Sequence, residues 1–500
     1  MQDWMNWGLL VLEFSALLFV FALGVGALLV VIMYVQDVRQ KQHAIRRNFP
    51  VIGRLRYQLE HLGEFFRQYF FALDREELPF NRAQRTWVYR AAKNLDSTLA
   101  FGSTRVLNQQ GDTLFLNAFI PKLETQAEQA SCLQIGEGYA KQPYQTRSFF
   151  NISGMSFGAL SVPAVRALSH GAAKAGIWMN TGEGGLSPYH LESGCDLVFQ
   201  IGTAKYGVRD AKGELSEEKL ERVALHEQVR MFEIKLSQGA KPGKGGILPG
   251  EKVTGLIAST RGIPEHEDSI SPNGQPEITS VDDLLDMIVR VRNITGKPTG
   301  FKFVMGQHDW LIKLCKRIAE RGPADAPDFI TLDSGDGGTG AAPQSLMDCV
   351  GLPLRTSLPI LVDQLERHRL RDRVRVFCSG KMINPSDVAW ALCMGADSVV
   401  NGRGFMFALG CIQALQCNKN TCPTGITTHN PALQKGLDTG VKSERVANYS
   451  ANMVKEVAMI AHSCGVSEPR QLNRHHVCVI DGHGDPIPMI EKHPYPTPMP

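Results

Sequence analysis

The pattern of hydrophobic and polar positions differs between the N-terminal end and the rest of the chain. Residues 14–35, FSALLFVFALGVGALLVVIMYV, form an apolar run without a charged side chain. Because a helix of about 20 apolar residues crosses the hydrocarbon core of a bilayer, the run predicts one transmembrane helix. A cleaved signal peptide would show a basic start, a shorter apolar stretch and a small-residue cleavage site, which are all missing.

The charges around this run predict its orientation. Asp3 and Glu13 are the charged residues before it, and basic residues dominate the segment after it. These basic residues are Arg39, Lys41, Arg46, Arg47, Arg54 and Arg56. The positive-inside rule then predicts an outside N-terminus, a single pass, and a cytoplasmic main body. We expect residues 1–36 to form the anchor and residues 37–144 to form a juxtamembrane helical and linker region.

From about residue 145, short β-branched apolar runs alternate with helical stretches. The strand-like runs are RSFFNISG, PTGFKFVMG, DFITLDSG, RVRVFCSG and ADSVVNGRG. The alternation predicts βα units, and the glycines after several strands favour a (β/α)8 TIM barrel with its active face at the C-terminal strand ends. A doubly wound sheet is the alternative, but no G-x-G-x-x-G follows the first strand of a unit. We place the barrel at 145–435 and a C-terminal extension at 436–500.

Glycine-rich loops after the late strands suggest a phosphate site. VFCSGKM (376–382) and VVNGRGF (399–405) follow two consecutive strands. Loops after strands seven and eight of such barrels commonly bind phosphate through backbone N–H groups, although ordinary turns have the same composition. DSGDGGTGAA (333–342) is a third such loop, and no G-K-S/T follows it, so it is not a Walker A motif.

Two basic features predict an anionic ligand. Lys302 lies inside the apolar strand GFKFV, where a lysine is unfavourable unless it meets an anion or an electron-rich cofactor ring. A strand-edge lysine that reaches solvent is the alternative. Residues 238–262 read as a long loop containing Lys241, Lys244, Lys252 and Arg261. Such a loop suits an anionic substrate, and a solvated basic loop is its plainer interpretation.

Composition limits the compartment and the partners. The 500 residues are 43% hydrophobic and 21% charged, which is ordinary for a folded protein with a sizeable core. The net charge of +3 comes without a long basic stripe, so we expect no nucleic-acid partner. The 11 cysteines are odd in number and lie mostly in apolar surroundings, which predicts free thiols in a reducing compartment.

Several stretches, in the same order, resemble the FMN-binding synthase domain of glutamate synthase over roughly residues 145–435. They are GMSFGALS, MNTGEGG, IKLSQGAKPGKGG, LPGEKV, DSGDGGTGAAP, LRDRVRV and GCIQALQCNKNTCPTGI. RRNFPVIGRLRY after the apolar run further resembles stand-alone, membrane-anchored glutamate-synthase-like proteins of bacteria. The resemblance implies an FMN-carrying oxidoreductase barrel, held at the bacterial inner membrane with its catalytic domain in the cytoplasm.

The resemblance also gives a role to three closely spaced cysteines. Cys411, Cys417 and Cys422 have the spacing C-x5-C-x4-C and match the family's ligands for a [3Fe-4S] cluster. A three-iron cluster lacks one corner iron, so three thiolates suffice where the cubane needs four. A zinc site with His429 as fourth ligand and three unligated thiols are the alternatives.

The resemblance implies which residues contact FMN and substrate. The implied FMN contacts are Ser153, Gln200, Lys302, Asp336, Gly337, Gly338, Ser379, Gly380, Gly402 and Arg403. Lys302 would face the N1 side of the flavin and stabilise the reduced ring. The implied catalytic positions are Glu183, Lys241 and Arg261: the two cations clamp the carboxylates of 2-oxoglutarate, and Glu183 steers ammonia or a proton.

The reaction implied is reductive amination of 2-oxoglutarate to glutamate, with departures that keep other interpretations open. Ile247 stands where the family has a glutamine that helps hold 2-oxoglutarate, so a different amine or oxo acid is one alternative, as in an N-alkylglutamate-forming enzyme. We expect no glutaminase domain, so ammonia would be free or supplied by another subunit. A non-catalytic electron-transfer subunit is the other alternative. The expected electron donor is a ferredoxin or a membrane redox chain, since no nicotinamide-binding fingerprint is visible.

Overall fold

The computed structural model describes residues 2–499, with the side chains of residues 2, 3, 64 and 65 excepted. By internal contacts the chain divides into two compact units, residues 1–83 and residues 84–500. Met1, where the predicted anchor starts, and Pro500, where the predicted extension ends, lie outside the described residues. The predicted domain boundaries stay a prediction.

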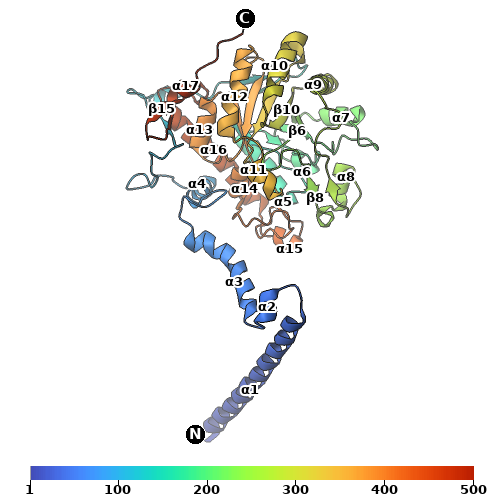
Figure 1. Cartoon of the computed structure of the whole chain (residues 1–500), viewed down its shortest axis with the longest axis vertical. Coiled ribbons are helices and arrows are strands. Elements are labelled where there is room, and N and C mark those ends of the chain that lie inside the picture. Colours follow the sequence, from blue (N-terminus) through green and yellow to red (C-terminus); the bar gives the residue numbers. More distant parts are fainter. Residues whose placement is uncertain (1, 500) are drawn as a thin grey trace. The chain divides into compact units, whose positions relative to one another are not determined.

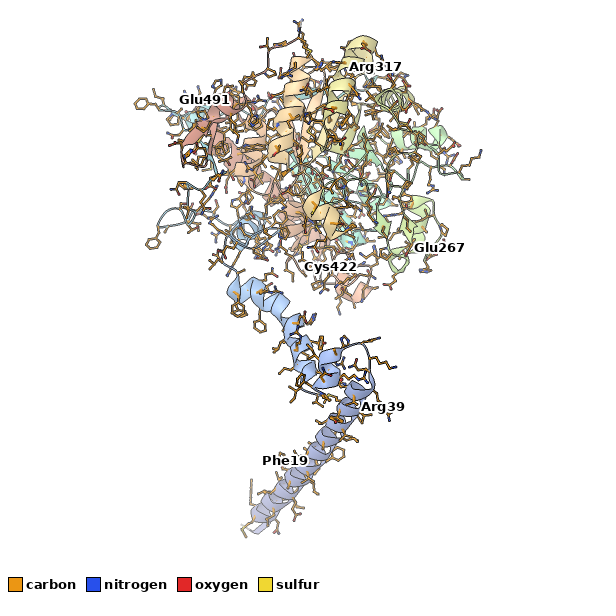
Figure 2. All side chains as sticks on the ribbon, in the orientation of Figure 1. Phe19, Arg39, Glu267, Arg317, Cys422 and Glu491 are labelled. Atoms are coloured by element: carbon orange, nitrogen blue, oxygen red, sulfur yellow. The ribbon has the colours of Figure 1, made fainter. Side chains whose placement is uncertain are left out.

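The first unit starts with a long apolar helix, α1 (Gln2–Arg39). From Trp4 to Arg39 it is long and apolar enough to cross a membrane, and its apolar stretch is not buried in the protein. Figure 2 shows the side chain of Phe19 projecting from this helix, and 65% of its surface is exposed. The predicted helix is therefore present, and its insertion into a membrane stays a prediction.

A buried carboxylate fixes the chain where α1 ends. Asp37 pairs with Arg46 at 3.0 Å and with Arg54 at 2.8 Å, and it accepts a hydrogen bond from the Val51 N–H at 3.0 Å. These contacts hold α1 against the next helices, which are α2 (Ala44–Asn48), α3 (Gly53–Phe66) and the π-helical turn η1 (Arg67–Phe71). The basic residues that predicted the orientation of α1 thus also shape the segment that follows it.

The second unit is built on a closed barrel of eight parallel strands, which confirms the predicted (β/α)8 fold. In barrel order the strands are β4 (Phe150–Ile152), β5 (Met179–Asn180), β6 (Leu197–Ile201), β7 (Val229–Lys235), β10 (Thr299–Val304), β11 (Phe329–Asp333), β12 (Arg375–Ser379) and β13 (Ser398–Asn401). The glycine-rich loops at 376–382 and 399–405 therefore do follow the seventh and eighth strands.

Each barrel strand is followed by at least one helix, and Figure 1 shows α9, α10 and α12 beside the strands. In chain order these helices are α5 (Val162–Ala175), α6 (Pro188–Leu191), α7 (Glu217–Ala224), α9 (Val281–Thr295), α10 (Asp309–Arg321), α12 (Leu354–Arg367), α13 (Pro385–Cys393) and α14 (Arg403–Leu409). α5 begins cleanly because Ser161 caps it, accepting from the Ala164 N–H, and Gly176 ends it in a left-handed conformation.

A hairpin packs into the barrel near the N-terminal ends of the strands. It consists of β2 (Leu133–Ile135) and β3 (Tyr144–Thr146). Its apolar residues share one buried cluster with Trp178 before β5 and Phe377 in β12. This end of the barrel is filled with apolar side chains, so a polar site is left to the opposite end.

The remaining elements cover the barrel and lengthen its loops. The longest, α16 (Thr439–Ser463), packs against α5, α13 and α14. A three-stranded sheet pairs the segment before the barrel with the C-terminal part of the chain. The elements concerned are α4 (Arg82–Ala92), β1 (Thr113–Phe115), β8 (Ile247–Leu248), α8 (Gly255–Arg261), β9 (Ser269–Ile270), α11 (Gln344–Cys349), α15 (Pro431–Gln434), β14 (Val477–Ile480), β15 (Pro486–Pro488) and α17 (Met489–Lys492).

Candidate active site

A cavity of about 480 Å³ lies where the C-terminal ends of the barrel strands meet their loops. Most of the predicted site residues line it, although they are spread over some 260 positions of sequence. Those lining it are Ser153, Glu183, Gln200, Lys241, Arg261, Lys302, Gly338, Ser379, Gly380, Gly402, Arg403 and Cys417. The predicted residues that do not line it are Asp336, Gly337, Cys411 and Cys422.

The late loops bring backbone rather than side chains to the cavity. Gly380, directly after β12, has a φ of +139°, and a Cβ there would lie 2.2 Å from the Ser334 Cβ. Gly338 lies under Arg403, and a Cβ there would come within 2.8 Å of the Arg403 Nε. Gly380 therefore requires glycine, and a side chain at Gly338 would displace Arg403, so both positions keep backbone accessible beside the cavity.

Arg403 supplies the charge beside these loops. Its guanidinium donates to the Thr339 carbonyl and forms no ion pair within 4 Å among residues 2–499. An unpaired guanidinium next to open backbone suits an anionic phosphate. Asp336, a predicted FMN contact, does not line the cavity. Its carboxylate pairs with Lys381 at 3.1 Å.

Lys302 is a buried, paired cation. Only 6% of its surface is exposed, and its Nζ lies 3.0 Å from Asp333 Oδ2, which excludes the alternative of a lysine that reaches solvent. Burial lowers the pKa of Lys302, but Asp333 and Glu233 outweigh burial and the net shift is upward. The ammonium therefore stays charged at the floor of the cavity, with a carboxylate already beside it.

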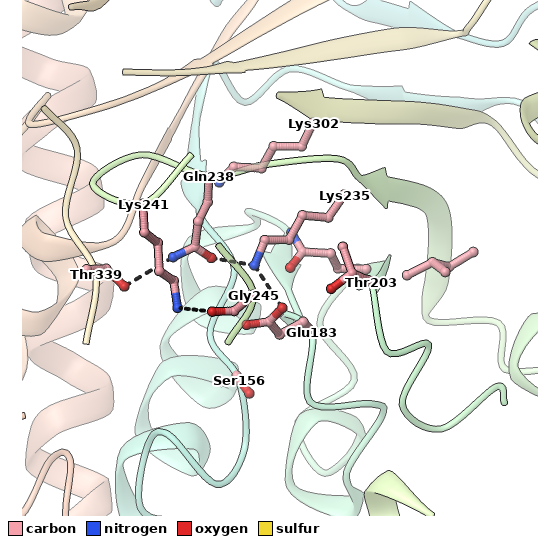
Figure 3. A network of polar contacts seen from close by, with 12 residues as sticks. Ser156, Glu183, Thr203, Lys235, Gln238, Lys241, Gly245, Lys302 and Thr339 are labelled. Atoms are coloured by element: carbon pink, nitrogen blue, oxygen red, sulfur yellow. Dashed lines mark hydrogen bonds and ion pairs between the residues drawn. The ribbon is translucent and has the colours of Figure 1, made fainter. Parts of the chain in front are cut away.

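Glu183 belongs to a second paired group, drawn in Figure 3. Lys235, the last residue of β7, donates to Glu183 Oε2 at 2.9 Å and also contacts Gln238 Oε1. Burial raises the pKa of Glu183, but the charges of Lys235, Lys241 and Arg261 outweigh burial and bring it below the ordinary value. Glu183 is therefore a carboxylate at neutral pH, which accepts hydrogen bonds and attracts cations.

Lys241 and Arg261 are buried cations without an acidic partner. They are 7% and 4% exposed, and neither has a carboxylate within 4 Å among the residues described. Lys241 reaches only the Gly245 carbonyl, at 3.5 Å. Arg261 donates to Ser269, Ser156 and the Phe157 carbonyl, and its Nε has no partner. Two buried positive charges are thus left for a ligand of opposite charge.

The structure adds two cavity residues that the sequence did not single out, and it shows what Lys252 of the predicted basic loop contacts. Lys235 and Gln238 line the cavity between Glu183 and Thr339. Lys252 lines it too: its ammonium is 2% exposed and donates to the carbonyls of Cys417 at 2.9 Å and Thr427 at 2.7 Å. No pattern along the chain marks Lys235, because β7 carries other charged residues, and the partners of Lys252 are far away in sequence.

The three predicted cluster ligands are free thiols on the loop after α14. They lie close enough to interact electrostatically: burial raises the pKa of Cys411, and Cys417 and Cys422 add to that shift. Arg403 Nη1 approaches the Cys417 sulfur at 3.8 Å. Hydrogen bonds from Thr424 and Thr427 overcome burial and lower the pKa of Cys422, which favours its thiolate.

The donor set distinguishes the three interpretations of the cysteines. Among residues 2–499, no three His, Cys, Asp or Glu side chains are arranged to hold one metal ion, and His429 Nε2 bonds to the Gly158 carbonyl at 2.7 Å. Zinc needs its four ligands at a single point. In a three-iron cluster each thiolate binds a different iron, so the sulfurs need not converge. The residues therefore fit the cluster better than they fit zinc.

The fold and the site together define a (β/α)8 barrel with a cation-rich cavity for an anionic ligand at its C-terminal face. Residues 97–467 match the conserved region of glutamate synthase. A glutamate synthase large subunit-like protein of Bacillus subtilis is 38% identical over 92% of this chain and 95% of its own length. The chain belongs to the glutamate synthase family, whose members are oxidoreductases.

Other relatives match over smaller shares. A glutamate synthase large subunit-like protein of Rhizobium meliloti is 31% identical over 78% of this chain and 88% of its own. An archaeal glutamate synthase [NADPH] of Methanocaldococcus jannaschii is 34% identical over 64% of this chain. The chain spans 60% of the length of that archaeal relative.

Solved structures with a similar chain course are flavoenzymes of low identity. A flavocytochrome b2 variant with pyruvate bound has a TM-score of 0.44 at 15% identity, covering 79% of this chain and 82% of its own. An (S)-mandelate dehydrogenase chimera has a TM-score of 0.47 at 13% identity, covering 73% and 87%.

Proposed function

We propose that the protein is a membrane-anchored, FMN-dependent glutamate synthase that converts 2-oxoglutarate and ammonia to glutamate. One observation carries this proposal: the buried cations Lys241 and Arg261, which have no acidic partner within the described part of the chain, line the same cavity as the predicted FMN residues. A dicarboxylate oxo acid would neutralise both charges. Membership of the glutamate synthase family supports the same substrate.

The reaction assigns a task to each residue. Ammonia and the keto carbon form an imine with loss of water, and a hydride and a proton then complete the amine. Reduced FMN, when bound, supplies the hydride. Arg261 and Lys241 hold the carboxylates, and the Glu183 carboxylate attracts ammonium to the keto group. Positioning and charge would carry the rate, and no covalent nucleophile is needed.

The cysteine loop and the electron donor complete the redox part of the proposal. Cys411, Cys417 and Cys422 would hold a [3Fe-4S] cluster that passes single electrons toward the cavity lined by Cys417. We propose a ferredoxin or a membrane redox chain as donor. Several relatives carry NADPH in their names, but no nicotinamide-binding fingerprint is visible in this sequence.

The proposed location is the bacterial inner membrane, with the barrel in the cytoplasm. The exposed apolar helix α1 and the basic residues after it support a single pass in that direction. The free thiols of the barrel suit a reducing compartment.

A second candidate is an enzyme of the same chemistry with another amine or oxo acid, such as an N-alkylglutamate-forming enzyme. Ile247 favours it, because this apolar side chain lines the cavity and is 48% exposed. Next to it, Gly246 leaves no room for a side chain against Glu183, so the chain at Ile247 runs close to the amine-attracting carboxylate. An alkyl group on the amine would find an apolar wall there. The unpaired cations argue against a non-catalytic electron-transfer subunit.

The test is an anaerobic reoxidation experiment on the full chain. The protein is purified with its FMN and iron quantified, reduced chemically, and mixed with 2-oxoglutarate with and without ammonium. We expect flavin reoxidation only with both present, and glutamate in proportion. Reoxidation with methylammonium but not with ammonium would establish the second candidate. A flavin that stays reduced with every amine and oxo acid tried would overturn the synthase assignment.

A further inference from the structure

A buried carboxylate without a cationic partner lies beneath the cavity. Glu233 on β7 faces the barrel interior, is 3% exposed, and has no Lys, Arg or His within 4 Å among the described residues. Its Oε1 accepts from Gln200 Nε2 at 2.7 Å and from Asn180 Nδ2 at 2.9 Å. Its Oε2 accepts from Thr331 Oγ1 at 2.6 Å. A carboxylate held only by neutral donors is an unusual feature of a barrel interior, and the reaction proposed above leaves it without a task.

The orientation of the two amides is fixed by these contacts. Asn180 Oδ1 accepts from the Gly182 N–H at 2.9 Å, so its Nδ2 has to face Glu233. Gln200 and Glu233 are direct neighbours on the paired strands β6 and β7, and a carboxylate oxygen requires a donor opposite it. Gln200 Nε2 is therefore held by Glu233. Gln200 Oε1 has no partner among residues 2–499, and the residue lines the cavity.

Glu233 also affects the balance of charge around Lys302. Lys302 pairs with Asp333 and is also attracted by Glu233, so one ammonium is balanced by two carboxylates. The prediction that Lys302 stabilises the reduced flavin rests on its positive charge. Asp333 and Glu233 thus offset the charge of Lys302.

We propose that Glu233 is a positioning residue that turns the Gln200 carboxamide oxygen toward the flavin and thereby keeps the flavin's reduction potential low. A carbonyl oxygen and a nearby carboxylate disfavour the extra negative charge of a reduced flavin. A lower potential makes the reduced flavin a stronger hydride donor. The inference rests on the proposed FMN site and concerns how this chain adjusts it.

The test is a redox titration of the flavin in the full-length holoprotein, followed by visible absorbance, with the cluster followed by EPR. Glu233→Gln keeps the size of the side chain and removes its charge. We expect its flavin midpoint potential to shift to more positive values. Thr331→Val is the matched control, because it removes one donor to the same carboxylate and leaves Gln200 held, so its potential should stay near that of the wild type.

Gln200→Met shows whether Glu233 acts through the amide. We expect it to raise the flavin potential, and the double variant to match Glu233→Gln. An unchanged potential in Glu233→Gln, or fully additive shifts in the double variant, would overturn the inference while the proposed function stands. If Glu233→Gln does not fold, an unchanged potential in Gln200→Met overturns it instead. Wild-type protein without FMN would overturn both.

Discussion

Two kinds of buried cation line one cavity. Lys302 and Lys235 each touch a carboxylate, Asp333 at 3.0 Å and Glu183 at 2.9 Å. Lys241 and Arg261 are equally buried and touch no carboxylate among the residues that the structure describes. Since burial of a charge is unfavourable unless a partner offsets it, the protein satisfies the first pair itself and leaves the second pair to a ligand.

For this reason the pKa of Lys302 is raised, whereas the pKa of Lys241 is lowered. Burial lowers the pKa of both, but the carboxylates beside Lys302 reverse the shift, whereas Glu183 does not do so for Lys241. The ion pairs of Lys302 and Lys235 therefore contribute to the stability of the folded protein. The buried charges of Lys241 and Arg261 are unfavourable, and the proposed substrate would relieve them.

Breaking a satisfied pair should give the largest effect. Lys302→Met leaves the Asp333 carboxylate buried without its cation, so we expect a loss of about 3–5 kcal/mol in the free energy of unfolding. Urea unfolding of the flavin-free protein measures it. Adding Asp333→Asn in the same chain should restore most of the loss, and equal stability of wild type and Lys302→Met would refute the paired half of the comparison.

Removing an unsatisfied cation should affect binding rather than stability. Arg261→Met is expected to weaken oxo-acid binding about 100-fold, because charge-assisted hydrogen bonds contribute about 1.5–3 kcal/mol each. The Kd for 2-oxoglutarate follows from perturbation of the flavin spectrum. The substrate-free variant should unfold no more easily than the wild type. A clear loss of stability with unchanged affinity would reverse the assignment of Arg261.

Lys241→Met should have a smaller effect on the same Kd. A lysine is a point charge without the fork of a guanidinium, so we expect a loss of about 10-fold, or about 1.4 kcal/mol. Lys241→Arg is the control and should retain most of the affinity. Glutamate formation at saturating substrate should remain in both variants, which separates binding from chemistry.

The pH dependence should give the smallest effect and should report on Lys241 alone. Its pKa lies below the ordinary lysine value in the free protein, and a bound carboxylate raises it again. As pH rises through the lowered pKa, the free protein loses the charge and oxo-acid affinity declines by a few-fold, at a pH below the ordinary 10.5. The decline should vanish in Lys241→Met. An identical decline there would trace it to another group.

The sequence predicted the fold through its late strands. PTGFKFVMG, DFITLDSG, RVRVFCSG and ADSVVNGRG became β10 to β13, because apolar residues dominate them and glycines mark their ends. β5, β6 and β7 were not singled out as strands. β5 has only two residues, and β7 carries Arg230, Glu233 and Lys235, which interrupt the apolar pattern that identifies a strand.

The sequence indicated site residues where a glycine or a charge is unusual along the chain. It did not indicate contacts between residues that are far apart in the sequence. Lys302 inside an apolar strand and glycines after strands are visible in one dimension. The ion pair of Lys235 with Glu183 spans 52 positions, and Lys252 meets carbonyls more than 160 positions away. No spacing rule relates such residues, because only the closed barrel brings their strands and loops together.

The sequence by itself determined the apolar helix, the parallel barrel, the glycine positions in the loops after the late strands and the set of charges near the C-terminal face of the barrel. These depend on local periodicity and on single residues in unfavourable surroundings. Only the tertiary structure decided which cations are satisfied and which remain free. That distinction depends on distances of about 3 Å between side chains from different strands, and the closure of the barrel sets those distances. The same barrel strands bring Glu233 next to Gln200, and no single stretch of sequence predicts this contact.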